Sequence, residues 1–249
     1  TTAYELSLGL VGSEMCIRDR DNTGHSLWKV NQIHHIEMIK AYFESIPCLY
    51  IADGHHRAAS ASRVQVLRNN DDSPSDFFLG AIYPHDEVQI LGYNRVVKDL
   101  AGLKSEDFVA LVKEKFRVTK LKEGETPNRR YCFSMLLDSQ WYRLEAKDKI
   151  MSHDSVLGLD ASILQDHIME PILKIDDPKT NNRIDFVGGI RGLKELERRC
   201  HLDAKVAFSL YPVTIDDLLK VSDEGKVMPP KSTWFEPKLR SGLVVRLLD

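Results

Sequence analysis

Three strand-like segments follow one another in the middle of the chain, and they restrict the folds open to it. Residues 117–122, 131–138 and 141–147 carry the apolar patterning of strands, with few residues between them. Strands joined by short turns pair in antiparallel fashion, whereas parallel neighbours require a long crossover. The sequence therefore predicts a mixed α/β (α+β) fold with a strand-rich lobe, without regular strand–helix alternation.

Further segments with helical or strand-like patterns lie on both sides of this lobe. Thr214 and Asp217 also have the capping-box pattern that opens a helix. The predicted helices are 33–45, 58–68, 160–172 and 191–200. The other predicted strands are 25–30, 48–52, 77–83, 87–92, 184–187, 206–210 and 243–248.

The composition is that of an ordinary globular protein. Of the 249 residues, 43% are hydrophobic and 29% are charged, which is enough to bury a core. The formal net charge is -3 and the pI about 6.3, so the sequence predicts no nucleic-acid or acidic-membrane binding face. No apolar run approaches the ~20 residues of a membrane span. The four cysteines are far apart, as expected for reduced thiols in a cytoplasmic protein.

Residues 1–20 show no sustained helical or strand period, and we expect them to be non-native. The codons ATG TGT ATA AGA GAC AGN encode the segment from Met15 to Arg20, and they closely resemble a transposon end used to fragment DNA for sequencing. A secretory signal is the competing interpretation. The segment lacks a basic start, however, and has charged residues where small ones should precede cleavage. The expected consequence is that the native N-terminus is missing.

The clearest chemical signal is the segment 53–57, with the sequence DGHHR. It follows the apolar run 48–52, which we expect to be a strand buried on both faces, and it leads into the helix at 58–68. Gly54 permits backbone torsions that other residues resist. The start of the helix offers unpaired N–H groups, and the planar fork of Arg57 can hold two phosphate oxygens. Together these features predict an anion-binding site.

The other side chains of this segment can move protons or hold a metal ion. His55 and His56 can donate hydrogen bonds or transfer protons near neutral pH. Asp53 could hold a metal, orient a histidine or accept a proton. The structural alternative is that Asp53 caps the helix and pairs with Arg57. We favour the functional interpretation because four chemically active side chains converge at one strand end. Zinc is disfavoured because adjacent histidines diverge.

Weaker candidates lie elsewhere in the chain. Asn94 and Arg95 follow a strand-like segment and could add a phosphate contact, with a surface ion pair as the structural alternative. Lys231, Lys238 and Arg240 lie in a loop that also contains proline, serine and threonine. That loop could close over an anion, or it could be a rigid packed segment.

Four segments resemble the domain-of-unknown-function family 1015, namely IADGHHRAASA, NRVVKDL, LDASILQDHIMEPIL and MPPKSTWFEPKLRSGL. The resemblance runs from about His25 to the C-terminus. Members of that family are much longer at the N-terminus, which agrees with the expected loss of native residues there.

The ADGHHR segment is also similar to the core motif of the ParB/sulfiredoxin-like superfamily. Sulfiredoxins have a reactive cysteine where this chain has His55, and the double arginine of ParB proteins is absent. Free serine kinases of this superfamily, with an Asp-Gly-His-His-Arg type motif, are the nearest functional analogue. The resemblance implies that His56 and Arg57 hold nucleotide phosphates and that Asp53 positions Mg²⁺ or the substrate hydroxyl. It also implies a glutamate base upstream, which is either Glu37 or a residue of the lost segment.

We therefore expect a non-native segment at 1–20, a ParB/sulfiredoxin-like nucleotide-binding core at 21–100 and a second lobe at 101–249. The expected function is a nucleotide-dependent phosphotransferase that acts on a small hydroxylated metabolite and uses ATP or ADP with Mg²⁺. A nucleotide hydrolase, or a nucleotide-responsive binding module without catalysis, is the alternative. The expected site residues are Asp53, His55 and Glu37 for catalysis, Gly54, His56, Arg57, Asn94 and Arg95 for the nucleotide, and Asp53 for the metal.

Overall fold

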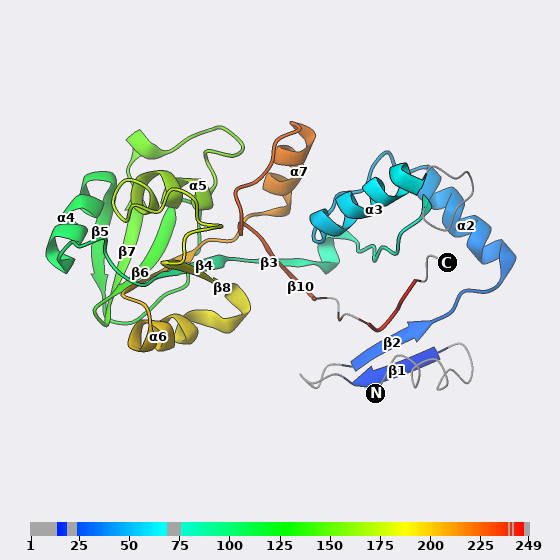
Figure 1. Cartoon of the computed structure of the whole chain (residues 1–249), viewed down its shortest axis with the longest axis horizontal. Helices are drawn as coiled ribbons and strands as arrows, with labels where there is room; N and C mark the ends of the chain where they lie inside the picture. Colours follow the sequence, from blue (N-terminus) through cyan, green and yellow to red (C-terminus); the bar gives the residue numbers. More distant parts are fainter. Residues whose placement is uncertain (1–13, 19–23, 69–75, 239, 241, 247–249) are drawn as a thin grey trace. The chain divides into compact units, whose positions relative to one another are not determined.

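The structure is a computed structural model (Figure 1). It describes residues 14–18, 24–68, 76–238, 240 and 242–246. The chain forms two compact units. One comprises Thr1–Ile82 together with Lys238–Asp249, and the other is Tyr83–Pro237.

A six-stranded antiparallel sheet forms the centre of the second unit (Figure 1). The strand order is β5-β7-β6-β9-β4-β8. The turn between β6 and β7 consists of Asp138 and Ser139, whose φ angles of 48° and 61° suit a tight hairpin. The three strands predicted in the middle of the sequence are confirmed as β5, β6 and β7. The strands are β4 Tyr93–Val97, β5 Phe116–Leu121, β6 Cys132–Leu137, β7 Gln140–Ala146, β8 Ile184–Gly188 and β9 Val206–Leu210.

Helices cover both faces of this sheet. Helices α4 (Ser105–Lys115) and α5 (Asp160–Leu164) contribute to the larger core, and α6 (Gly192–Leu202) contributes to a smaller core on the opposite face. Along β4, Val97 belongs to the larger core and Val96 to the smaller one. Residues two apart on a strand share a face, so Arg95 points to the same side as Val97 and α5.

The predicted helix at 160–172 is irregular. After α5 the backbone continues as a π-helix, η4 (Gln165–Met169), and the Glu170 N–H donates to the Gln165 carbonyl at 3.0 Å. Pro171 has no N–H and cannot continue a helical ladder. π-helical turns are rare and are frequent at functional sites.

The remaining elements of the second unit are short. Helix α7 (Ile215–Asp223) begins with the predicted capping box. Strand β3 (Gln89–Leu91) pairs with β10 (Trp234–Glu236) in a two-stranded antiparallel sheet. This pairing holds the preceding loop against the large sheet, where Lys231 Nζ lies 5.4 Å from the centroid of the Tyr93 ring. The 3-10 helices are η2 His85–Glu87, η3 Asp148–Ile150 and η5 Gly189–Arg191.

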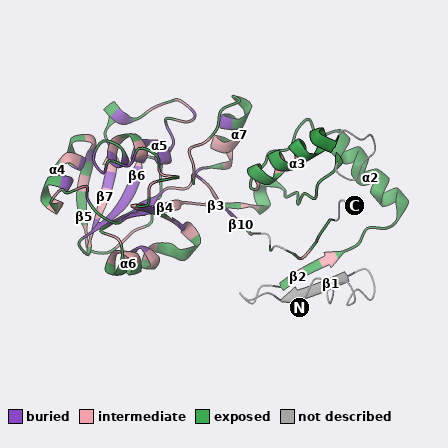
Figure 2. Cartoon of the chain, in the orientation of Figure 1, coloured by how far each residue is buried: buried purple, intermediate pink, exposed green. Residues whose placement is uncertain are grey.

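The first unit contains a strand pair and two helices, and none of their described side chains is buried. Strand β1 (Glu14–Arg18) pairs with β2 (Gly24–Trp28), and the predicted helices are confirmed as α2 (Ile33–Glu44) and α3 (His55–Arg68). No residue of α2 or α3 is buried, as Figure 2 shows. Every buried side chain of the described residues belongs to the second unit.

Three strand predictions were wrong. Residues 48–52 and 77–83 form no strand, and apolar side chains such as Leu49 are exposed. A strand requires hydrogen-bonding neighbours, and no described segment pairs with either run. Of the strand predicted at 243–248, residues 243–246 form none, and 247 and 248 lie outside the described residues.

The compact unit that contains the large sheet begins at Tyr83. It includes β4, because β4 hydrogen-bonds to β8 and β9 and so belongs to the large sheet. Of the segment expected to be non-native, residues 1–13, 19 and 20 lie outside the described residues. None of the helices in the described part of the chain combines the length and apolar character that crossing a membrane requires.

Candidate functional site

The DGHHR segment forms the turn that begins α3. Gly54 has a φ of 87°, in the left-handed region that favours glycine. Its N–H donates to Asp53 Oδ1 at 2.8 Å. Its carbonyl accepts the first bond of the helical ladder, from the Ala58 N–H at 3.0 Å. The N–H groups of residues 55–57 therefore precede the ladder and have no partner within the helix.

The guanidinium of Arg57 lies against Gly54. A Cβ placed on Gly54 would be 3.1 Å from Arg57 Nη2 and 3.3 Å from Nε. The cation thus lies beside the start of α3, where the helix dipole already carries partial positive charge. Two positive features at one place favour a bound anion, and a guanidinium fork can hold two phosphate oxygens.

Asp53 accepts hydrogen bonds through both carboxylate oxygens. Oδ2 pairs with Lys238 Nζ at 2.9 Å, and Oδ1 accepts from the Gly54 N–H. Partial burial raises the pKa of Asp53, but these hydrogen bonds and the charges of Lys238 and Arg57 together outweigh it, so the pKa is below its usual value. Asp53 is therefore ionised at neutral pH. Lys238, one of the cations noted in the C-terminal loop, is in this way part of the motif.

The other predicted catalytic residues lie on the two helices of the first unit. His55 and His56 are exposed at the start of α3, and Glu37 is exposed on α2. Among the described residues, Glu37 makes no hydrogen bond or ion pair with the segment 53–57. The structure thus brings Asp53 and its neighbours together with Lys238, while the role expected for Glu37 rests on the motif resemblance.

Asn94 and Arg95 belong to the second unit, on β4. The side-chain oxygen of Asn94 accepts a hydrogen bond from the Leu210 N–H at 3.2 Å, inside the sheet. Arg95 is only 5% exposed, and its guanidinium donates to the carbonyls of Tyr93 and Lys231. Both side chains are buried, so the surface ion pair considered for them is excluded.

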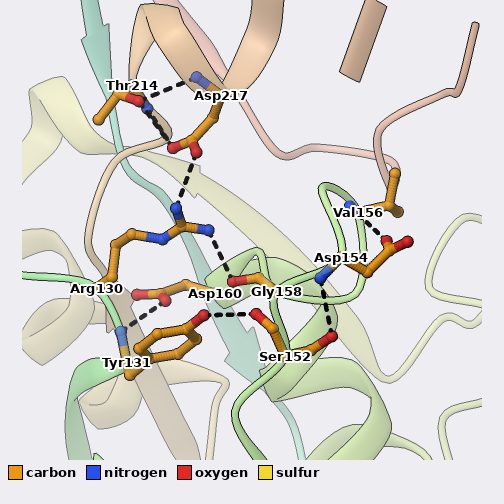
Figure 3. A network of polar contacts seen from close by, with 9 residues as sticks. All are labelled: Arg130, Tyr131, Ser152, Asp154, Val156, Gly158, Asp160, Thr214 and Asp217. Atoms are coloured by element: carbon orange, nitrogen blue, oxygen red, sulfur yellow. Dashed lines mark hydrogen bonds and ion pairs between the residues drawn. The ribbon is translucent and has the colours of Figure 1, made fainter. Parts of the chain in front are cut away.

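A polar network surrounds the start of α5 (Figure 3). Asp160 Oδ1 accepts from the Tyr131 N–H at 2.8 Å, whereas its buried Oδ2 has no hydrogen-bond partner. Arg130 joins Asp217 of α7, at 2.9 Å, to the carbonyl of Gly158, at 3.0 Å. An unpaired buried carboxylate oxygen is costly, so Asp160 is the least satisfied polar group of this network.

Burial controls the ionisation of Asp160 and Arg95. Asp160 is 6% exposed, and burial raises its pKa to about 7, although the Tyr131 N–H and the charges of Arg130 and Arg95 lower it. Burial lowers the pKa of Arg95 to about 10, and the charge of Asp160 opposes this. At neutral pH Arg95 is therefore charged, while Asp160 is only partly ionised.

The described residues contain no group of three or more histidine, cysteine, aspartate or glutamate side chains that could hold a metal ion.

The sequence pattern did not single out Asp160. It marked this residue only as the start of a helix, where an acidic side chain is ordinary. Its environment includes the N–H of Tyr131, 29 residues away in sequence, which donates to it, and the charge of Arg95, which acts on it. A pattern in the local sequence cannot predict that residues so far apart in the chain lie close together.

The chain has a mixed α+β fold, and a glycine turn at the start of a helix brings the Arg57 guanidinium against Gly54. The family described as "Protein of unknown function (DUF1015)" matches residues 13–162, and the chain belongs to that family. No curated protein matches the chain.

Several solved structures are similar to the chain. A mutant free serine kinase in complex with AMP is 14% identical, with a TM-score of 0.45, over 83% of this chain and 81% of that chain. A mutant free serine kinase in complex with ADP is 16% identical, with a TM-score of 0.43, over the same shares of the two chains. A conserved hypothetical protein from Pyrococcus furiosus is 14% identical, with a TM-score of 0.41, over 82% of this chain and 84% of that chain.

Proposed function

We propose that residues 53–57 bind the phosphates of a nucleotide and that the protein transfers a phosphoryl group to a hydroxyl of a small metabolite. The observation that carries the proposal is the Arg57 guanidinium lying against Gly54 at the start of α3, beside the ionised Asp53. A phosphate there meets both the guanidinium fork and the N–H groups of the first helical turn. Phosphoryl transfer requires mainly positioning and charge neutralisation, which this set supplies.

The carboxylate of Asp53 distinguishes this site from a simple anion site. A carboxylate beside bound phosphates is repelled unless a cation lies between them. Lys238 pairs with Asp53 at 2.9 Å and is one candidate for that cation. Mg²⁺ is commonly held by one or two carboxylates together with substrate phosphates, so Asp53 fits it. When bound, Mg²⁺ would neutralise charge on the phosphates.

The remaining roles follow the Asp-Gly-His-His-Arg motif of free serine kinases, and we accordingly place the first unit in the ParB/sulfiredoxin-like superfamily. His56 and Arg57 hold the phosphates of ATP or ADP, and Gly54 leaves room for them. His55 and Glu37 are the candidates to accept the proton of the substrate hydroxyl. A general base must come within hydrogen-bond reach of the proton that it removes.

The test begins with nucleotide binding. The thermal unfolding midpoint is measured with AMP, ADP and ATP, with and without Mg²⁺, for the wild type, Arg57→Ala and Arg63→Ala. Arg63 is an exposed arginine on the same helix and controls for loss of one positive charge. We expect a nucleotide to raise the midpoint of the wild type and of Arg63→Ala, but not of Arg57→Ala.

A second measurement separates the activities. The nucleotide that binds is incubated with a panel of small hydroxylated metabolites, serine included, and phosphorylated products are identified by mass spectrometry. Product formation supports the kinase. Nucleotide consumption without a phosphorylated acceptor indicates a hydrolase, and binding without turnover indicates a non-catalytic module. A well-folded chain whose midpoint no nucleotide shifts contradicts the whole proposal.

A further inference from the structure

A cavity separate from the DGHHR segment lies within the second unit. Its volume is about 360 Å³, within the range of small-molecule sites. Arg95 of β4 and Phe186 of β8 come from the sheet, while Ala161 and Gln165 come from α5 and the π-helix. Its other lining residues are Asp176, Asp177, Pro178, Lys179, Pro229 and Pro230.

The buried charge of Arg95 is only partly balanced, because the charge of Asp160 acts on it while Asp160 is itself only partly ionised at neutral pH. Its guanidinium donates to two backbone carbonyls, those of Tyr93 and Lys231, and lies 5.7 Å from the centroid of the Phe186 ring. Among the described residues, no carboxylate lies within ion-pair distance of Arg95. Burying a charge that forms no ion pair is costly, so an anion bound beside Arg95 would offset an unfavourable feature of the protein.

The neighbouring groups hold Arg95 in place. Ser232 is buried and donates to the Pro229 carbonyl at 2.7 Å, which fixes the turn whose Lys231 carbonyl accepts from Arg95. Gln165, at the start of the π-helix, donates to the Ile175 carbonyl at 2.7 Å and so holds the loop on the opposite wall. The guanidinium is therefore positioned by the fold before any ligand binds.

We propose that this cavity is a second ligand site, which binds a small metabolite through a carboxylate or a single phosphate group paired with Arg95. The apolar wall of Phe186, Pro229 and Pro230 would contact the rest of the molecule. Asp176 and Asp177 line the cavity together with Lys179, and their negative charge disfavours polyanions such as pyrophosphate. The site is independent of the nucleotide site proposed for the first unit.

Calorimetric titration of the whole 249-residue chain tests this site at constant ionic strength. The probes are glycolate for the carboxylate arm, inorganic phosphate for the phosphate arm, and pyrophosphate for the polyanion. All titrations use chains that carry Arg57→Ala, so that phosphate binding at the DGHHR segment does not contribute. We expect glycolate or inorganic phosphate to bind, and pyrophosphate to bind more weakly than either.

Two pairs of variants locate the binding. Arg95→Met should weaken it by about tenfold or more, whereas Arg117→Met, at an exposed arginine of β5, should not. Lys179→Glu tests the rim of the cavity without disturbing the core, and Lys194→Glu, at an exposed lysine of α6, is its control. We expect several-fold weaker binding for Lys179→Glu alone.

Circular dichroism establishes whether Arg95→Met folds. If this variant does not fold, the comparison of Lys179→Glu with Lys194→Glu decides whether the ligand binds in this cavity. Absence of binding by glycolate and inorganic phosphate overturns the proposal. So does equal binding by both members of each variant pair, or tighter binding of pyrophosphate. A positive result here together with no nucleotide response would leave this site standing while the proposed kinase function fails.

Discussion

Asp160 retains a proton at a pH where exposed aspartates have lost theirs, because burial outweighs the N–H and guanidinium groups around it. Its pKa of about 7, against the ordinary 3.8, means that the folded state binds this proton more tightly than the unfolded state. The resulting stabilisation is fully present below about pH 4 and is lost as the pH rises towards 7. This group alone should lower the free energy of unfolding across that window by on the order of a few kcal/mol.

The substitution Asp160→Asn should remove this pH dependence. The amide oxygen can still accept from the Tyr131 N–H, and no charge is buried at high pH. We expect the variant to be more stable than the wild type at pH 8 by roughly 1–3 kcal/mol, and by less than that at pH 5. Urea unfolding at the two pH values measures the difference.

Asp166→Asn, at an exposed position of the adjoining π-helix, is the matched control for this substitution. It should leave the pH profile as it is in the wild type. An Asp160→Asn chain that loses stability between pH 5 and pH 8 as steeply as the wild type does would show that Asp160 is not the group that titrates.

Gly54→Ala should weaken nucleotide binding. The φ of 87° costs a residue with a Cβ roughly 1–2 kcal/mol, and the new Cβ would lie 3.1 Å from Arg57 Nη2. We expect Arg57 to be displaced and the dissociation constant for the nucleotide to rise by about tenfold. Gly80→Ala, where a Cβ meets nothing within 4 Å, is the control in the same unit.

The residues that sequence reasoning identified are those whose chemistry is local. Gly54 and Arg57 are three positions apart, and the contact between them follows from the turn and helix that the sequence predicts. Arg95 was noticed for its charge, but its burial depends on a fold in which Tyr93, Lys231 and Phe186 surround it. Such pairings join distant segments, so only the three-dimensional structure reveals them.

At the scale of single elements, the contribution of the α7 cap to stability can be measured by substitution. The Thr214 side chain accepts from the Asp217 N–H at 3.1 Å, and the Asp217 carboxylate accepts from the Thr214 N–H at 3.2 Å. Thr214→Ala removes the first of these bonds, so we expect a loss of about 1 kcal/mol in the free energy of unfolding. Ser222→Ala, at an exposed position near the end of α7, should cost less. Equal losses in the two variants would mean that the cap does not stabilise the helix.

Strand predictions succeeded or failed according to whether a neighbouring strand is available to pair with the segment. The segments 117–122, 131–138 and 141–147 were predicted correctly as strands because they are apolar and follow one another closely, and the turn at Asp138-Ser139 joins two of them. The runs 48–52 and 77–83 are as apolar, yet no described strand lies beside them. Apolar character measures a tendency to be buried, whereas a strand also needs a neighbour, which the local sequence does not encode.

At the scale of the whole molecule, the two units differ in what stabilises them. All buried side chains of the described residues lie between Asn94 and Phe235, inside the unit Tyr83–Pro237. We expect a fragment of residues 83–237 to fold alone, because both hydrophobic cores lie within it. Its urea unfolding midpoint should match that of the main transition of the full chain. A fragment without cooperative unfolding would show that this unit depends on the rest of the chain.

The strand order of the large sheet also determines how much of the chain must be synthesised before all six strands can pair. Strands β5 and β7 pair only with strands close in sequence, whereas one edge of β6 pairs with β9, and Val96 in β4 pairs with Asp185 and Ala207. At ordinary translation rates these partners emerge roughly 5–20 seconds later. For that interval the apolar end of β4, Val96-Val97, has no strand to pair with. Nascent chains are therefore most prone to aggregate after β7 is synthesised and before β9 emerges from the ribosome. A chaperone would be most useful during that interval.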